Sequence, residues 1–365
     1  MSVTNVVAIV GLVQSLFGIL IFITKRPKHL SFLFLVMWLA VMATFLGGIL
    51  LPFHITEYFK PGLFPAIFLV GPLLFFYVSS LTVEEFRLRP KHILHIIPMT
   101  IIMVHRSIVN SVPMSTPFIY NEVYYSLLVM SLALYWFLSL KLILKHRKNV
   151  PFHFSNYTQK NSLTWLIFVL SAFFIFFVVH FFVSSIHRIW GVDLIRTPAF
   201  HINFTIFTFI MIFFGINQSA IYRPEKRGDK NSLPSNGFNN EGVKLPQSTL
   251  NKKQVEKLYD EVYSYLEKRK PYLNPDFSLQ MMSDDLNISR QKLSMVINFS
   301  RQKNFYRLIS EFRVAEVKEK LADPAYNHYS VLGIGLESGF NSKTSFNRIF
   351  KEETGLTPTE YKRSI

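Results

Sequence analysis

The sequence contains no cysteine, and this absence excludes several kinds of site at once. Disulfide frameworks, thiolate-bound metals, iron–sulfur clusters and cysteine nucleophiles all require a thiol. Acidic residues are also scarce in residues 1–222, which hold 5 Asp and Glu beside 15 Lys and Arg. No H-E-x-x-H, G-x-S-x-G or P-loop pattern occurs, and no carboxylate pair falls within an apolar stretch. We therefore predict that the chain is not an enzyme and holds neither a cofactor nor a metal.

Apolar residues are abundant and unevenly placed along the 365 residues. Half of the residues are apolar and only 17% are charged, which is too apolar for an ordinary soluble protein. Residues 251–365, however, hold 19 Lys and Arg and 15 Asp and Glu, a density typical of a soluble domain. Residues 223–250 are polar and rich in Asn, Gly and Pro, without helical or strand periodicity. We predict a transmembrane sensor domain over 1–222, a flexible cytoplasmic linker over 223–250 and a soluble domain over 251–365.

Seven apolar stretches in the first part are long enough, or nearly so, to cross a bilayer core. They cover approximately residues 3–24, 30–53, 63–83, 92–110, 122–144, 162–186 and 201–221. The fourth is the weakest, because it carries Pro98 and is interrupted by His105 and Arg106. The first lacks the basic start and the small-residue cleavage site of a signal peptide, so we interpret it as a span.

The charges of the loops predict the orientation of these spans. Loops after the first, third and fifth spans hold eleven basic residues, and the three opposite loops hold four. The eleven are Lys25, Arg26, Lys28, Arg87, Arg89, Lys91, Lys141, Lys145, Arg147, Lys148 and Lys160, and the four are Lys60, Arg106, Arg188 and Arg196. Because basic loops favour the cytoplasmic side, we predict a multi-pass protein of the inner cell membrane. Its N-terminus then lies outside and its C-terminal domain in the cytoplasm.

Ten of the eleven histidines lie in the predicted membrane domain. His95, His180 and His201 fall near or within spans, where ionisable groups are functional candidates. We interpret them as side chains that bond a neighbouring backbone group or help two helices to pack. A His-ligated metal or haem is the alternative, which no i, i+4 pair within one span supports.

The soluble part shows the periodicity of an all-helical domain. Six apolar residues of 254–269 form one helical stripe, and two short helix–turn–helix patterns follow, separated by a helix over 304–323. In the first pattern Asn287 and Ile288 form the turn and Ser289 is a good N-cap; in the second Gly339 forms the turn. Asn341 or Ser342 is expected to cap the helix after that turn. The connecting helix spaces the following residues for burial: Phe305, Leu308, Ile309, Phe312, Ala315 and Leu321.

One run of residues at the C-terminus is specific to a family. It comprises Arg313, Ala315, Ile334, Gly339, Phe340, Phe346, Arg348, Phe350, Lys351, Gly355, Thr357, Pro358 and Tyr361. Through these residues, the last 90 or so residues of the chain resemble the DNA-binding domain of AraC/XylS-family bacterial transcription regulators. Ser283 and Gly335 replace the alanine usual in the family, and Gln302 replaces a common glycine. Ser283 and Gly335 are both small, so we expect the two helices of each helix–turn–helix unit to cross as closely as in the family.

The resemblance implies binding to double-stranded DNA, with each second helix in one of two successive major grooves. The positions that we expect to be exposed on the first recognition helix are Arg290, Gln291, Ser294, Met295 and Asn298. On the second recognition helix they are Lys343, Thr344, Asn347 and Arg348. Arginine suits guanine, and Asn or Gln suits adenine, by bidentate geometry.

These observations predict a membrane-anchored, one-component transcription regulator that couples a signal at the membrane to gene expression. Its partners would be DNA, the bilayer, a small-molecule or envelope signal, a second copy of the chain and, for an activator, RNA polymerase. The alternative is a seven-span transporter or receptor whose C-terminal domain binds protein, and a membrane enzyme ranks third. The sequence leaves open the stimulus, the target genes, the sign of regulation and the oligomeric state.

Overall fold

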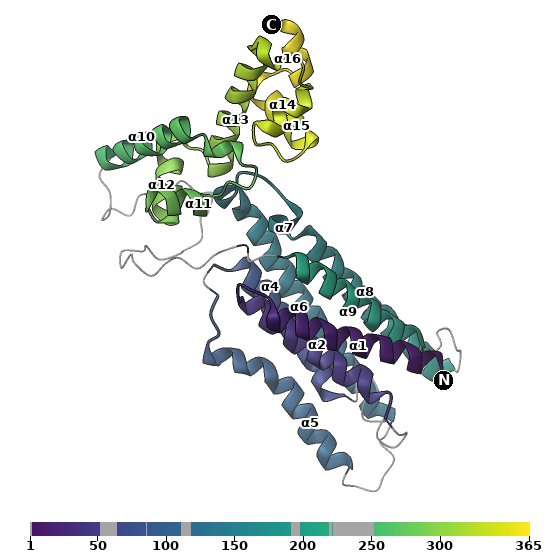
Figure 1. The fold of residues 1–365 in the computed structure, drawn as a ribbon. Helices are drawn as coiled ribbons and strands as arrows, with labels where there is room; N and C mark the ends of the chain where they lie inside the picture. Colours follow the sequence, from purple (N-terminus) through teal and green to yellow (C-terminus); the bar gives the residue numbers. More distant parts are fainter. Residues whose placement is uncertain are drawn as a thin grey trace. The chain divides into compact units, whose positions relative to one another are not determined.

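The structure is a computed structural model that describes residues 2–51, 64–84, 86–110, 118–190, 198–218, 221 and 252–365. Over these residues the chain is all-α, as predicted, and forms no strand beyond one isolated bridge (Figure 1). It divides into two compact units. Unit 1 comprises Met1–His146 and Leu163–Pro224, and unit 2 comprises Arg147–Ser162 and Glu225–Ile365. The predicted linker, residues 223–250, lies outside the described residues.

Unit 1 is a set of apolar helices around α2. Its elements are α1 (Val3–Thr24), α2 (Leu30–Gly48), η2 (Pro65–Leu69), α4 (Val70–Thr82), η3 (Pro90–Ile96), α5 (Ile97–Asn110), α6 (Phe118–His153), α8 (Thr164–Trp190) and α9 (Pro198–Asn217). Helix α2 packs against α1, α4 and α9. Its Trp38, Leu39, Met42 and Phe45 are buried in the core of the unit. The last turns of α6, from Arg147 onward, belong to unit 2.

Helices lie at all seven expected span positions, but they differ in length. Within the described residues, five helices are long and apolar enough to cross a membrane. They are Val3–Thr24, Leu30–Gly48, Pro65–Thr82, Val123–His153 and Thr164–Ile186, and His201–Asn217 is a shorter apolar helix. Helix α5, at the fourth expected span, has 14 residues and is not among the five. The count of seven spans stays a prediction.

Unit 2 contains the two expected helix–turn–helix units joined by one long helix. Its elements from residue 252 onward are α10 (Lys252–Arg269), η4 (Pro271–Leu273), α11 (Leu279–Leu286), α12 (Arg290–Arg301), α13 (Phe305–Ala322), η5 (Pro324–Tyr326), α14 (Val331–Glu337), α15 (Lys343–Thr354) and α16 (Pro358–Ser364). The first helix–turn–helix is α11–α12 and the second is α14–α15. Helix α13 contributes core residues to both, with Leu308 and Ile309 packed in the first and Val317 and Leu321 in the second.

The turns of both units follow the predicted chemistry. Asn287 adopts a left-handed conformation with φ 53° at the end of α11, and Ser342 caps α15 by accepting the Ser345 amide at 3.2 Å. Gly339 has φ +92°, and a Cβ placed there would lie 2.2 Å from the Tyr272 carbonyl oxygen. Glycine is therefore required at this turn both by the backbone conformation and by the close approach.

Three expectations about single residues need correction or addition. Ala315 is exposed and Phe312 is half-buried, whereas Arg313 between them is fully buried. Ser289 occupies the N-cap of α12, but its side chain makes no capping hydrogen bond. Ser283, where the family has alanine, donates its hydroxyl to the Ile288 carbonyl at 2.6 Å and so closes the first turn.

Gln302 ends α12 in the left-handed region, with φ 54°. Glycine adopts this conformation without the steric cost that a Cβ incurs. We expect Gln302→Gly to raise the free energy of unfolding of unit 2 by about 0.5–1 kcal/mol, measured by urea denaturation. Gln302→Ala, which keeps the Cβ, is the matched control and should give no gain; equal gains from both would contradict the explanation.

Candidate nucleic-acid interface

The second recognition helix, α15, presents the predicted residues to solvent. Phe346, Ile349 and Phe350 are buried in the core of the second helix–turn–helix. The residues on the opposite side of α15 are exposed, and they are Lys343, Thr344, Asn347 and Arg348. The helix therefore presents two positively charged side chains and one amide on one accessible stripe. Such a stripe suits contacts with phosphates and base edges.

Arg348 is held in position on this stripe. Its Nη1 donates to the Glu352 carboxylate and its Nη2 to the Tyr306 hydroxyl, both at 2.8 Å. Burial alone lowers the pKa of Arg348, but the hydrogen bond to Glu352 and the nearby Tyr306 and Glu352 charges raise it above its ordinary value. The guanidinium is thus charged and pre-oriented at the junction of α15 and α13.

The expected exposure of the first recognition helix, α12, is wrong for three of its five predicted residues. Gln291 and Asn298 are half-buried, whereas Arg290, Ser294 and Met295 are 5%, 3% and 6% exposed. A direct base contact requires an accessible side chain. The structure therefore brings the four α15 residues together on an exposed face, and the assignment of the five α12 residues stays a prediction.

A buried arginine links α13 to two other segments of unit 2. Arg313 Nε donates to the Tyr272 carbonyl at 2.8 Å, and Nη2 donates to the Asn274 carbonyl at 3.0 Å. Nη1 donates to the Ser155 carbonyl at 2.8 Å, and Nη2 also reaches the Ser155 hydroxyl at 3.0 Å. Burial lowers the pKa of Arg313 to about 9, which leaves the guanidinium charged at neutral pH. Sequence reasoning selected Arg313 only as a family residue and missed this role.

Sequence reasoning also missed the segment that supplies Ser155. Residues Phe154–Tyr157, which we call the strap, follow α6 and precede α8 in the sequence, and they pack within unit 2. Phe154 forms the isolated antiparallel bridge with Ser278, and the Ser155 amide donates to the Phe277 carbonyl at 3.3 Å. The one signal in the sequence is a polar segment, Ser155 to Ser162, that separates two apolar helices.

A second buried charge stabilises the turn that carries Tyr272. Glu316 accepts from Lys270 Nζ at 2.7 Å and from the Tyr272 hydroxyl at 3.2 Å, and Lys320 lies 3.6 Å away. Burial alone raises the pKa of the Glu316 carboxyl, but the hydrogen bond with Lys270 and the charges of Lys270 and Lys320 outweigh it and lower the pKa. The network holds η4 against α13.

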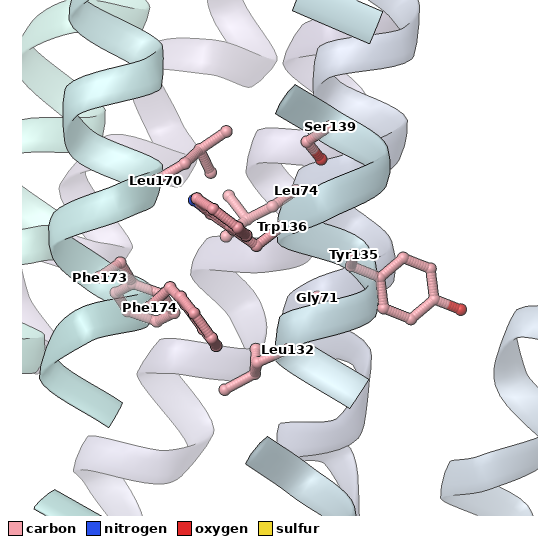
Figure 2. A pocket seen from close by; sticks show the side chains of 9 residues that line it. All are labelled: Gly71, Leu74, Leu132, Tyr135, Trp136, Ser139, Leu170, Phe173 and Phe174. Carbon is pink, nitrogen blue, oxygen red and sulfur yellow. The ribbon is translucent and has the colours of Figure 1, made fainter. Parts of the chain in front are cut away.

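The candidate side chains of unit 1 make packing contacts. His95 Nδ1 lies 2.6 Å from the Tyr135 hydroxyl, His180 Nε2 lies 3.3 Å from Ser184 Oγ, and His201 stacks on Phe45. A small cavity between α4, α6 and α8 is lined mainly by apolar side chains, and Trp136 stacks on Phe174 beside it (Figure 2). Over the residues that the structure describes, no three His, Asp or Glu side chains are grouped as metal ligands.

Comparisons with known proteins concern the C-terminal part. Residues 282–364 match the model of a protein family described as a helix-turn-helix domain, of the AraC type. An uncharacterized HTH-type transcriptional regulator of Staphylococcus aureus (strain COL) is 30% identical over 116 residues. These residues are 32% of this chain and span 14% of that protein's length. A solved protein of unknown function from Listeria innocua is 24% identical, covers 29% of this chain and 96% of its own, and has a TM-score of 0.26.

The lowered pKa of Glu316 predicts a loss of stability in acid. Because folding lowers this pKa, Glu316 stabilises unit 2 above the pKa of an unfolded glutamate, about 4.3. The contribution is lost as the pH falls through the folded-state value. We expect Glu316→Gln to flatten the acid side of a plot of urea midpoint against pH. Glu319→Gln, at an exposed carboxylate 4.0 Å from the same Lys270, is the control and should keep the wild-type profile.

Proposed function

Because residues 282–364 form an AraC-type helix-turn-helix domain, we propose that the chain is a membrane-anchored, sequence-specific regulator of transcription. The observation that carries the proposal is the exposed stripe of α15 on a domain with two helix–turn–helix units. Two such units on one connecting helix suit two successive major grooves, roughly 34 Å apart on one face of DNA. The Staphylococcus aureus relative, which is named as a transcriptional regulator, agrees with this function.

The surface of unit 1 supports anchoring in a bilayer. Phe168 is 75% exposed, and Phe17, Leu20 and Ile175 are more than half exposed on the same helices α1 and α8. In water each such side chain would leave apolar area unburied, at about 25 cal/mol per Å². Lipid removes this cost, since its tails are as apolar as the side chains. The alternation of Phe168 with the buried Phe173 and Phe177 fits a helix that faces lipid on one side.

The charges of the loops and the cytoplasmic location of DNA support the proposed orientation of the chain in the membrane. The eleven basic residues in the predicted cytoplasmic loops, against four in the others, favour a cytoplasmic C-terminal domain. Unit 1 is then the part available to a small-molecule or envelope signal. A second copy of the chain and, for an activator, RNA polymerase complete the proposed set of partners. In the alternative of a transporter or receptor, the C-terminal domain binds protein and not DNA.

Two adjacent residues of α15 should have separate roles, one in DNA recognition and the other in folding. Asn347→Ala should weaken specific DNA binding by about 1–3 kcal/mol without changing the thermal midpoint, because the amide contacts a base and no core atom. Phe346→Ala should instead unfold the second unit, at a cost of about 3–5 kcal/mol. Anisotropy with genomic fragments selected by the wild-type protein measures the binding.

Asn327→Ala is the matched control for this pair, since Asn327 is an exposed asparagine that is not part of α15. It should change neither the binding nor the thermal midpoint. Wild-type affinity in Asn347→Ala would mean that this face of α15 does not contact base edges. Binding by the wild-type protein that ignores sequence at every salt concentration would contradict the proposed function itself.

The predicted orientation gives a separate test in cells. A reporter that is active only in the cytoplasm should be active when fused after Lys148 or Lys230. The same reporter should be silent after Lys60 or Arg196, because those residues lie in the predicted outer loops. Activity at Lys60 together with silence at Lys148 would reverse the orientation.

A further inference from the structure

The strap, residues Phe154–Tyr157, contacts both helix–turn–helix units of unit 2. Toward the first unit, the Ser155 amide and hydroxyl both donate to the Phe277 carbonyl, just before α11. Toward the second unit, the Asn341 side-chain amide donates to the Tyr157 carbonyl at 3.1 Å, just before α15. The Tyr157 ring packs edge-on against Tyr306 of α13, with ring centroids 5.5 Å apart.

One side chain of the strap bridges the two units directly. Asn156 is buried, and its Nδ2 donates to the Pro275 carbonyl at 2.6 Å and to the Gly339 carbonyl at 3.1 Å. Pro275 precedes the first helix–turn–helix, and Gly339 is the turn of the second. A single amide with two donors therefore ties together the two parts whose spacing decides whether both recognition helices reach DNA.

We propose that the strap is the regulatory coupling element of this protein. It holds the two helix–turn–helix units in a fixed mutual arrangement, and a displacement of the helices α6 and α8 that flank it changes that arrangement. The proposal rests on the proposed function, in which unit 1 receives the signal and unit 2 binds DNA. The occupant of this surface of unit 2 is a segment of the same chain, inserted between two apolar helices.

The strap is joined directly to its flanking helices on both sides. On one side α6 runs for 36 residues to His153, with Pro151 in its last turn, and is about 54 Å long against a bilayer core of about 30 Å. On the other side Asn161 donates to the Asn156 carbonyl at 2.8 Å and accepts from the Thr158 amide at 2.8 Å. These bonds fold the chain into α7 (Gln159–Ser162) directly before α8.

The junction with α8 carries backbone strain. Leu163 is fully buried and has φ 52°, in the left-handed region that a leucine rarely adopts. Such conformations persist only where the surroundings impose them, and they occur at switching segments. A short, bonded connection of this kind transmits displacement. A 28-residue flexible connection over 223–250, as its composition predicts, would transmit mainly proximity.

The test uses the full-length protein in lipid nanodiscs and the amide that bridges the units. The probes are a genomic fragment selected by the wild-type protein and the same fragment with one of its two half-sites scrambled. We expect Asn156→Ala to lower the affinity for the intact fragment about tenfold, because the two units no longer hold the spacing of two grooves. Affinity for the half-site fragment should equal that of wild type, which also shows that the variant is folded.

The control for this substitution is again Asn327→Ala, which should match the wild-type protein on both fragments. Wild-type affinity of Asn156→Ala for the intact fragment would overturn the coupling. Equal losses on the intact and half-site fragments would also overturn it, since they would show a general loss of fold. If the wild-type protein selects no fragment, the proposed function fails. A cross-link then tests separately whether the strap packs against unit 2.

The absence of native cysteine makes the cross-link clean. Phe154 and Ser278 are bridge partners, and paired antiparallel residues have the Cα separation that a disulfide needs. Phe154→Cys with Ser278→Cys should form an intramolecular disulfide in the full-length protein, seen as a mobility shift that a reductant reverses. Phe154→Cys with Asn327→Cys is the reference pair and should stay reduced. A reduced first pair would overturn the seating of the strap.

The cross-link also distinguishes positioning from a general loss of fold. In the Asn156→Ala background the Phe154–Ser278 disulfide fixes the strap in place by another bond. Oxidation should then restore most of the affinity for the intact fragment, and reduction should remove it again. Equal affinity in the oxidised and reduced states of that triple variant would overturn the role of the strap.

Discussion

The buried guanidinium of Arg313 is the constraint on which unit 2 depends. A charge removed from water is tolerated only when its donors are hydrogen-bonded, and among the described residues carbonyl and hydroxyl oxygens bond them. Those oxygens belong to Tyr272, Asn274 and Ser155. Loss of any one of these partners would leave an N–H group unsatisfied in the interior. Two segments far apart in the sequence, residues 272–274 and Ser155, are therefore fixed against the middle of α13.

This arrangement determines what the two helix–turn–helix units do together. Helix α13 contributes its first half to one core and its second half to the other, and Arg313 lies where the two halves meet. The same region holds Gly339, whose lack of a side chain permits the close approach of the Tyr272 carbonyl. The relation between the recognition helices thus depends on a small set of polar contacts together with the one helix, α13, that packs in both cores.

The helices of unit 2 were predictable because their signals are local. Apolar spacing of 3.6 residues, a left-handed turn at Asn287 and a capping Ser342 each act within a few residues of sequence. Ala315 was misplaced because α13 turns different faces to its two cores, so one helical stripe does not describe its burial. The strap was not predictable: Arg313 and Ser155 are 158 residues apart, and backbone carbonyls leave no trace in the sequence. The exposure of α12 depends on packing in the same way.

The two units are interleaved along the chain because the strap belongs to unit 2. Unit 2 takes up residues 147–162 from within the apolar half, so the boundary between the units is crossed at α6, before α8 and again after α9. Composition alone marks only the last of these crossings, because a short polar segment between two spans resembles any cytoplasmic loop. A domain joined to a membrane at one point can rotate about its connection. Unit 2 also incorporates the connection between two apolar helices, so it is joined to unit 1 at more than one point of the chain, and this connectivity is what the proposed coupling through the strap uses.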